Sequence, residues 1–146
     1  RRRPTMWTSY LSGQFFLPLL AIFYLIGYPL VNEYILSSGV SAERSEAAQY
    51  IKEKTKDGDT IYAWDTSASL YQKSSRLSAV SLLTPTLYVG TAENRLGLQK
   101  GLENSQPKYI LVNNDVKLLS DVKQLISQNY KEADLKLDHF KLYQLK

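Results

Sequence analysis

Residues 47–64 read AAQYIKEKTKDGDTIYAW, and this stretch decides the class of fold. Its first apolar residues recur at helical spacing, and the pattern predicts a helix that is capped by Ser41 and runs through about Lys56. The Asp-Gly-Asp turn at residues 57–59 ends this helix. The β-branched and aromatic run at residues 60–64 then predicts a buried strand. A helix, a turn and a buried strand in this order indicate an α/β layer.

The same alternation continues toward the C-terminus. Residues 109–112 (YILV) predict a second buried strand, with an amphipathic helix before it and another after it. Residues 133–137 and 139–145 alternate apolar and polar side chains around Asp138, which predicts an antiparallel hairpin. We therefore expect a small α/β sandwich of two or three layers, with a mainly parallel sheet of about three strands and an antiparallel C-terminal hairpin. The helical positions are Thr91, Leu98 and Leu102 for the first helix, and Leu118, Val122, Leu125 and Ile126 for the second.

Toward the N-terminus, residues 15–31 read FFLPLLAIFYLIGYPLV, and no charged residue lies between Arg3 and Glu33. Because a spanning helix needs about 20 predominantly apolar residues, this run predicts a transmembrane helix. A cleaved signal peptide and a buried core helix are the alternatives, disfavoured by the length of the run and by its lack of a cleavage site and of a polar face. The basic start places the N-terminus in the cytoplasm and the C-terminal domain outside the cell membrane. We therefore divide the chain into residues 1–36, a basic cap and transmembrane helix, and residues 37–146, an extracytoplasmic α/β domain.

The formal net charge of +4 comes mainly from one end of the chain. Three of the 18 basic residues are Arg1, Arg2 and Arg3, and the other 15 face 14 acidic residues, which leaves +1. Because the basic residues do not form a stripe over a folded surface, we expect no nucleic-acid partner. The absence of cysteine excludes disulfide scaffolds, zinc ribbons and thiol nucleophiles, and the single histidine, His139, cannot supply a multi-histidine metal site. We expect no metal and no cofactor.

The order of these features resembles a known family. The predicted span and the stretch at residues 47–64 are followed by D-x-x-x-x-LY at residues 65–71, PKYILVNN at residues 107–114 and a closing FKLYQLK. This order is similar to the C-terminal region of bacterial multi-spanning glycosyltransferases of the GT-C type, which include protein mannosyltransferase-like and aminoarabinose transferase-like enzymes. Such enzymes transfer a sugar from a polyprenyl phosphate carrier to an acceptor outside the membrane. The family's catalytic acidic residue lies in an early extracytoplasmic loop, so the resemblance assigns no catalytic residue to this chain.

Polar side chains follow both predicted buried strands. Asp65 follows the first strand, and Asn113 and Asn114 follow the second. Ligands of open α/β sheets bind outside the carboxyl ends of the strands, so these residues predict a binding site for a sugar or a lipid head group. The alternative is that they are ordinary turn and N-cap residues. The aromatic faces of such a site are predicted to come from Trp64, Tyr71 and Tyr88.

Two functions remain open from the sequence. The first is a peripheral domain of an integral membrane glycosyltransferase, in contact with the lipid bilayer, the upstream transmembrane region of the same protein, and a lipid-linked sugar or an envelope acceptor. The second is a stand-alone, membrane-anchored, non-enzymatic binding or assembly domain. The chain begins with Arg rather than Met, which we interpret as a fragment of a longer protein. Under either function we do not expect the chain to be catalytic by itself. The spacing of its residues gives no carboxylate pair and no nucleophile–base set.

Overall fold

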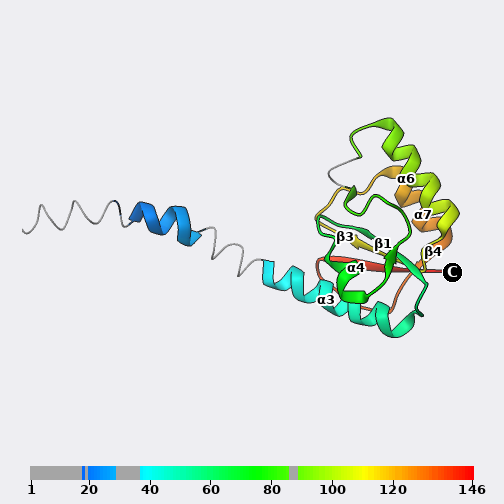
Figure 1. The fold of residues 1–146 in the computed structure, drawn as a ribbon, viewed down its shortest axis with the longest axis horizontal. Helices are drawn as coiled ribbons and strands as arrows, with labels where there is room; N and C mark the ends of the chain where they lie inside the picture. The colour runs from blue at the N-terminus through cyan, green and yellow to red at the C-terminus, as the bar shows by residue number, and fades with distance from the viewer. Residues whose placement is uncertain (1–17, 19, 29–36, 86–88) are drawn as a thin grey trace, which may run out of the picture. The chain divides into compact units, whose positions relative to one another are not determined.

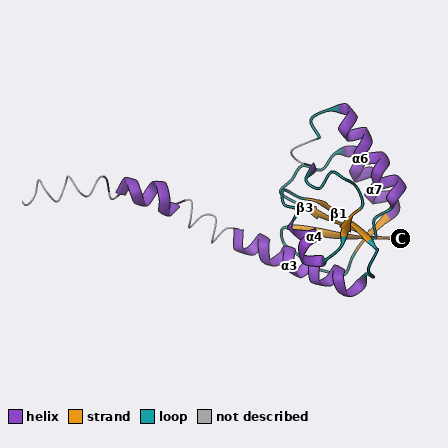
Figure 2. Cartoon of the chain, viewed as in Figure 1, coloured by secondary structure: helices purple, strands orange, loops and turns teal. Residues whose placement is uncertain are grey.

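The computed structural model describes residues 18, 20–28, 37–85 and 89–146. The chain divides into two compact units, Arg1–Val40 and Ser41–Lys146. Helices and strands alternate from α3 to β4, and β5 then follows β4 directly (Figures 1 and 2). The elements of the described residues are η1 (Phe23–Gly27), α3 (Ser37–Lys54), β1 (Thr60–Trp64), α4 (Ser69–Ser74), β2 (Leu77–Ser78), α6 (Ala92–Ser105), β3 (Tyr109–Asn113), α7 (Ser120–Asn129), β4 (Tyr130–Glu132) and β5 (Phe140–Leu145).

The strands form one mixed, five-stranded sheet in the order β2-β1-β3-β5-β4. Strand β1 pairs in parallel with β2 on one side and with β3 on the other, where Trp64 lies opposite Val112. Strand β5 pairs antiparallel with both β3 and β4, and its Phe140 lies opposite Asn113. The carboxyl ends of β1 and β3 therefore lie side by side at one edge of the sheet.

Helices cover both faces of this sheet (Figures 1 and 2). Helix α3 packs on one face, where the Tyr50 ring meets the Tyr109 ring edge-on with 6.2 Å between the ring centroids. Helix α4 contacts α3, since Lys73 Nζ donates to Ser45 Oγ at 2.5 Å. Helices α6 and α7 pack on the opposite face. Their buried side chains cluster with Ile110 of β3, which follows Tyr109 and therefore points to the other face of the sheet. The core under α6 and α7 contains Tyr62, Trp64, Leu98, Leu102, Ile110, Val112, Val122, Leu125, Ile126 and Tyr130.

The helix–turn–strand stretch that opens the domain is found where the sequence predicts it, with one change of boundary. Strand β1 occupies the predicted residues, and Gly58 in the turn before it has a φ of 99°, a left-handed conformation that favours glycine. Helix α3 begins at Ser37, so Ser41 lies inside the helix and is not the N-cap. Farther along, Thr91 caps α6 as predicted, since its hydroxyl accepts from Asn94 N at 3.3 Å.

The predicted fold class is wrong in two respects, of which the first is the sheet. The sheet is mixed rather than mainly parallel, because the C-terminal hairpin joins it through β5 next to β3, inside the sheet. The first arm of that hairpin is β4, directly after α7, and not residues 133–137. In those residues the backbone turns on itself, with Leu135 N donating to Ala133 O at 2.8 Å. Their alternating pattern therefore does not correspond to a strand.

The second correction concerns the predicted transmembrane helix at residues 15–31. Among the residues that the structure describes, no helix is long and apolar enough to cross a bilayer. The described helical run covers residues 20–28, and its part Phe23–Gly27 is wound as a π-helix; the rest of the predicted span, apart from Pro18, lies outside the described residues. An apolar composition does not by itself provide the helix of about 20 residues that a crossing needs. The predicted membrane localisation rested on this helix, and the described residues do not support it.

Candidate functional site

The carboxyl ends of β1 and β3 bring together two of the predicted site residues. Asp65 directly follows β1 and is fully buried, and Asn113 ends β3 with an exposed fraction of 5%. Because the two strands are parallel neighbours, the side chains meet, and Asn113 Nδ2 donates to Asp65 Oδ1 at 2.9 Å. Thr66 N donates to the same oxygen at 2.8 Å.

Arg44 of α3 completes this cluster. Its Nε donates to Asp65 Oδ2 at 2.6 Å, and its guanidinium carbon lies 5.4 Å from the centroid of the Phe140 ring. Both carboxylate oxygens of Asp65 are therefore occupied by donors of the protein itself. Sequence reasoning missed Arg44, although a signal was present: Arg44 stands three residues before Ala47 and seven before Ile51, on the stripe that faces the sheet. A charged residue on a buried stripe requires a buried partner.

Asn114 lies beside this cluster but bonds to the segment just before β5, in the connection between the two strands of the C-terminal hairpin. Its backbone N donates to His139 O at 2.8 Å, and its Nδ2 donates to Asp138 O at 3.2 Å. His139 N in turn donates to Glu43 Oε2 of α3 at 2.8 Å. Asp115 N donates to Asn113 Oδ1 at 2.9 Å, an arrangement typical of an Asx turn. These bonds connect α3, the loop after β3 and the hairpin.

Trp64 and Tyr71 are not gathered with Asp65. Trp64 points into the core under α6 and α7, on the other face of the sheet from α3. The Tyr71 hydroxyl accepts from Ala63 N at 3.0 Å, at the edge of β1 that the two-residue strand β2 leaves uncovered. Burial raises the pKa of Tyr71 above its ordinary value, which keeps this hydroxyl protonated. Tyr88 lies outside the described residues.

The geometry of the cluster is that of a structural brace between α3, β1 and β3. Among the described residues, no group of three or more His, Cys, Asp or Glu side chains is placed to hold a metal ion. Binding of a sugar or a lipid head group stays a prediction for Asp65, Trp64, Tyr71, Asn113 and Asn114. Both carboxylate oxygens of Asp65 already accept hydrogen bonds from other groups of the chain.

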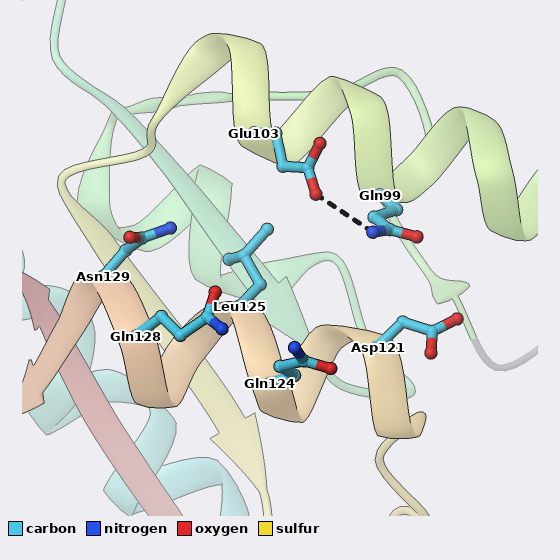
Figure 3. Close-up of a pocket in the computed structure, with 7 residues that line it drawn as sticks. All are labelled: Gln99, Glu103, Asp121, Gln124, Leu125, Gln128 and Asn129. Atoms are coloured by element: carbon cyan, nitrogen blue, oxygen red, sulfur yellow. Dashed lines mark hydrogen bonds between the residues drawn. The ribbon is translucent and has the colours of Figure 1, made fainter.

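A second candidate site is the groove between α6 and α7, with a volume of about 300 Å³ (Figure 3). Helix α6 contributes Gln99 and Glu103, which bond to each other, Gln99 Nε2 donating to Glu103 Oε1 at 3.0 Å. Helix α7 contributes the opposite wall, and its buried Leu125 lies between the polar side chains (Figure 3). The complete lining is Gln99, Glu103, Asp121, Gln124, Leu125, Gln128 and Asn129.

The chemistry of this groove is uniform. Four side chains carry carboxamides, two carry carboxylates, and no basic residue lines it. Gln124, Gln128 and Asn129 are exposed, and their amide groups make no hydrogen bond with another described residue. Sequence reasoning missed the groove because its polar residues lie on the solvent faces of two helices. Only the packing of α6 beside α7 brings those faces together.

One comparison with known proteins identifies relatives of this chain. A family model described as "Putative competence-induced protein Ccs4 C-terminal domain" matches residues 41–146, the range of the second compact unit. No curated protein and no solved structure matches the chain. The resemblance to GT-C glycosyltransferases is therefore wrong, because the matching family is a different one. The glycosyltransferase function drawn from it, and the membrane-anchored alternative, find no support in the family or in the structure.

Proposed function

The chain belongs to the family of Ccs4 C-terminal domains, and we propose that its α/β domain binds a positively charged stretch of polypeptide in the groove between α6 and α7. The family description says that its protein is competence-induced. Those words concern the condition under which the protein is made, and they name no ligand. The proposal therefore rests on the chemistry of the groove.

The observation that carries the proposal is the pair of carboxylates in a groove without a basic side chain. Glu103 and Asp121 stand on opposite walls and both are exposed. The chain as a whole has a formal net charge of +4, so attraction of a cationic ligand must come from a local group of acidic residues. Interactions between exposed charges are screened beyond about 8 Å at physiological salt, so the two carboxylates act on a ligand inside the groove.

The carboxamides favour a polypeptide over a simple cation. Gln124, Gln128 and Asn129 each offer donors and an acceptor, which match the N–H and C=O groups of a peptide backbone. The groove also has no aromatic side chain in its lining, and sugar rings commonly pack on such side chains. A lysine- or arginine-containing segment in an extended conformation therefore fits the groove better than a sugar does.

A binding titration tests this proposal. The probe is a fluorescein-labelled peptide of alternating lysine and glycine, and fluorescence anisotropy follows its binding to the full chain. We expect saturable binding, and the substitutions E103Q and D121N together should weaken it severalfold, up to about thirtyfold, since exposed ion pairs contribute up to about 1 kcal/mol each. Both substitutions keep the shape of the side chain and remove its charge.

The matched control carries the same change of charge elsewhere. Glu53 of α3 accepts from Gln49 Nε2 at 3.1 Å, a pair that copies the geometry of Gln99 and Glu103. Asp134 is exposed and does not line the groove. The variant E53Q/D134N should bind within about twofold of the wild type. Equal weakening in both variants, or equal binding of a glutamate–glycine peptide, would show that the groove does not select this ligand.

A further inference from the structure

Two buried hydrogen-bond donors of β1 have no partner in the part of the chain that the structure describes. They are the Tyr62 hydroxyl and the indole Nε1 of Trp64, whose residues are exposed by only 0% and 1%. The two residues alternate with Ala63 along the strand, so their side chains lie on the same face of the sheet. An unpaired buried donor costs stability, and its retention in a fold calls for an explanation such as a missing ligand.

The core around these donors adjoins a cavity of about 310 Å³ beside α6. Val80, Leu82 and Leu98 line the cavity, and the same three side chains pack in the cluster that contains Tyr62 and Trp64. The side of the cavity toward the sheet is therefore apolar. The remaining lining residues are Ser81, Glu93, Asn94 and Gly97.

We propose that this cavity binds a small, neutral, mainly apolar molecule with an acceptor oxygen, such as a ketone, and that this oxygen pairs with the indole N–H of Trp64 once Val80 and Leu82 move aside. The apolar wall favours an apolar body. The indole is a donor only, and burial raises the pKa of Tyr62 far above its ordinary value, so its hydroxyl keeps its proton to donate. A charged ligand is disfavoured because it would lose its hydration without a buried counter-charge.

This site is separate from the groove proposed for a peptide. The two share no lining residue, although both involve α6. Loss of one activity therefore leaves the other testable.

The chain offers a matched pair of variants for the test. Gly97 lines the cavity, and a Cβ added to it would meet nothing within 4 Å, so we expect the leucine side chain of G97L to occupy space that the ligand needs. Gly39 of α3 has the same open surroundings and does not line the cavity, so G39L is the control. Thermal unfolding checks that both variants remain folded.

The readout is the indole N–H signal of Trp64 in proton–nitrogen NMR spectra. The chain has two tryptophans, Trp7 and Trp64, so W7F leaves Trp64 as the only indole. Cyclohexanone is the probe, and methylenecyclohexane is a control of the same shape without an acceptor. We expect cyclohexanone to move the indole proton downfield in a saturable way in W7F and in W7F/G39L, with the shift lost in W7F/G97L. Methylenecyclohexane should cause no downfield shift.

Three results would overturn the proposal. The first is no downfield shift with cyclohexanone, or a shift that rises linearly with its concentration and never saturates. The second is a saturable shift of the same size in W7F/G97L, which would place the ligand elsewhere. The third is an equal shift with methylenecyclohexane, which would show that no hydrogen bond to the indole forms.

Discussion

Asp65 carries a buried charge that connects three elements, α3, β1 and β3. Its side chain is fully buried, the side chain of Arg44 is exposed by only 10%, and their closest atoms are 2.6 Å apart. Burying two charges costs hydration free energy, which their attraction repays only when the remaining polar atoms are also bonded. Asn113 and Thr66 provide those additional bonds to Asp65. The cluster therefore fixes how α3 packs on the carboxyl ends of β1 and β3.

Removal of one partner of this pair should destabilise the domain strongly. We expect D65A to lower the free energy of unfolding by about 3–5 kcal/mol, because it leaves the Arg44 guanidinium buried without its counter-charge. The double variant R44M/D65A should be less destabilised than the sum of R44M and D65A, by about 0.5–3 kcal/mol. Urea unfolding followed by circular dichroism measures all four proteins.

An exposed ion pair provides the control for this cycle. Lys141 Nζ and Glu132 Oε2 are 3.9 Å apart, and their side chains are exposed by 50% and 57%. The same cycle with K141M and E132A should give a coupling below about 1 kcal/mol. If the Arg44–Asp65 coupling is no larger than this value, the cluster is not the brace described above.

Sequence reasoning located half of this cluster. It placed Asp65 and Asn113 at neighbouring strand ends, because the carboxyl ends of parallel strands share one edge of the sheet. It missed Arg44, whose role depends on the face of α3 that packs against the sheet. It also grouped Trp64 with Asp65, although adjacent residues of an extended chain point to opposite faces. The contacts show that Trp64 belongs to the other layer of the fold.

Helix α6 contains two glycines in different surroundings, one turn apart. A Cβ added to Gly97 would meet nothing within 4 Å, whereas one added to Gly101 would lie 2.6 Å from Val80 Cγ1. Glycine in a helix costs roughly 0.5–1 kcal/mol relative to alanine. We therefore expect G97A to raise the free energy of unfolding by about that amount. We expect G101A to lower it, because the stiff, partly buried side chain of Val80 would have to shift, at a cost of about 1–3 kcal/mol.

Val80 decides whether this explanation holds. In the background V80A the close contact at Gly101 is absent, so G101A should now stabilise the helix as G97A does. Thermal and urea unfolding of V80A and V80A/G101A measure the difference. A G101A variant that is equally harmful with and without Val80 would point to another cause, such as a changed helix geometry.

Local sequence patterns predicted the elements better than their boundaries. Strand β1 and helix α6 follow from a β-branched run and a capped apolar stripe, which are properties of the segment itself. The start of α3 at Ser37 did not follow, because Ser41 has the residue type of an N-cap and helix ends are the least certain part of such a prediction. The sequence also does not predict strand β4, since its three residues form a strand only by pairing with β5.

Local sequence patterns predict neither the order of the strands in the sheet nor the family of the chain. Alternating strands and helices suggested a parallel core, but the place of β5 next to β3 depends on pairing between distant segments. The resemblance to glycosyltransferases rested on residue types that many helix–turn–strand segments share, and on an apolar run read as a membrane span. The family match and the absence of a spanning helix among the described residues correct both interpretations.

Residues 37–146 should fold as a domain by themselves. All the buried residues of the described core lie between Arg44 and Leu142, and the boundary between the compact units falls at residues 40 and 41. A shortened chain of residues 37–146 should therefore unfold within about 2 °C of the full chain, since a change of 1 kcal/mol shifts the midpoint by roughly 4–8 °C in a domain near this size.

A second shortened chain, residues 46–146, lacks Arg44 and leaves Asp65 without its cation, so its midpoint should fall well below that of the first. Calorimetry of the three proteins measures these midpoints. If residues 37–146 melt far below the full chain, residues 1–36 stabilise the domain, and the division proposed from the contacts is wrong.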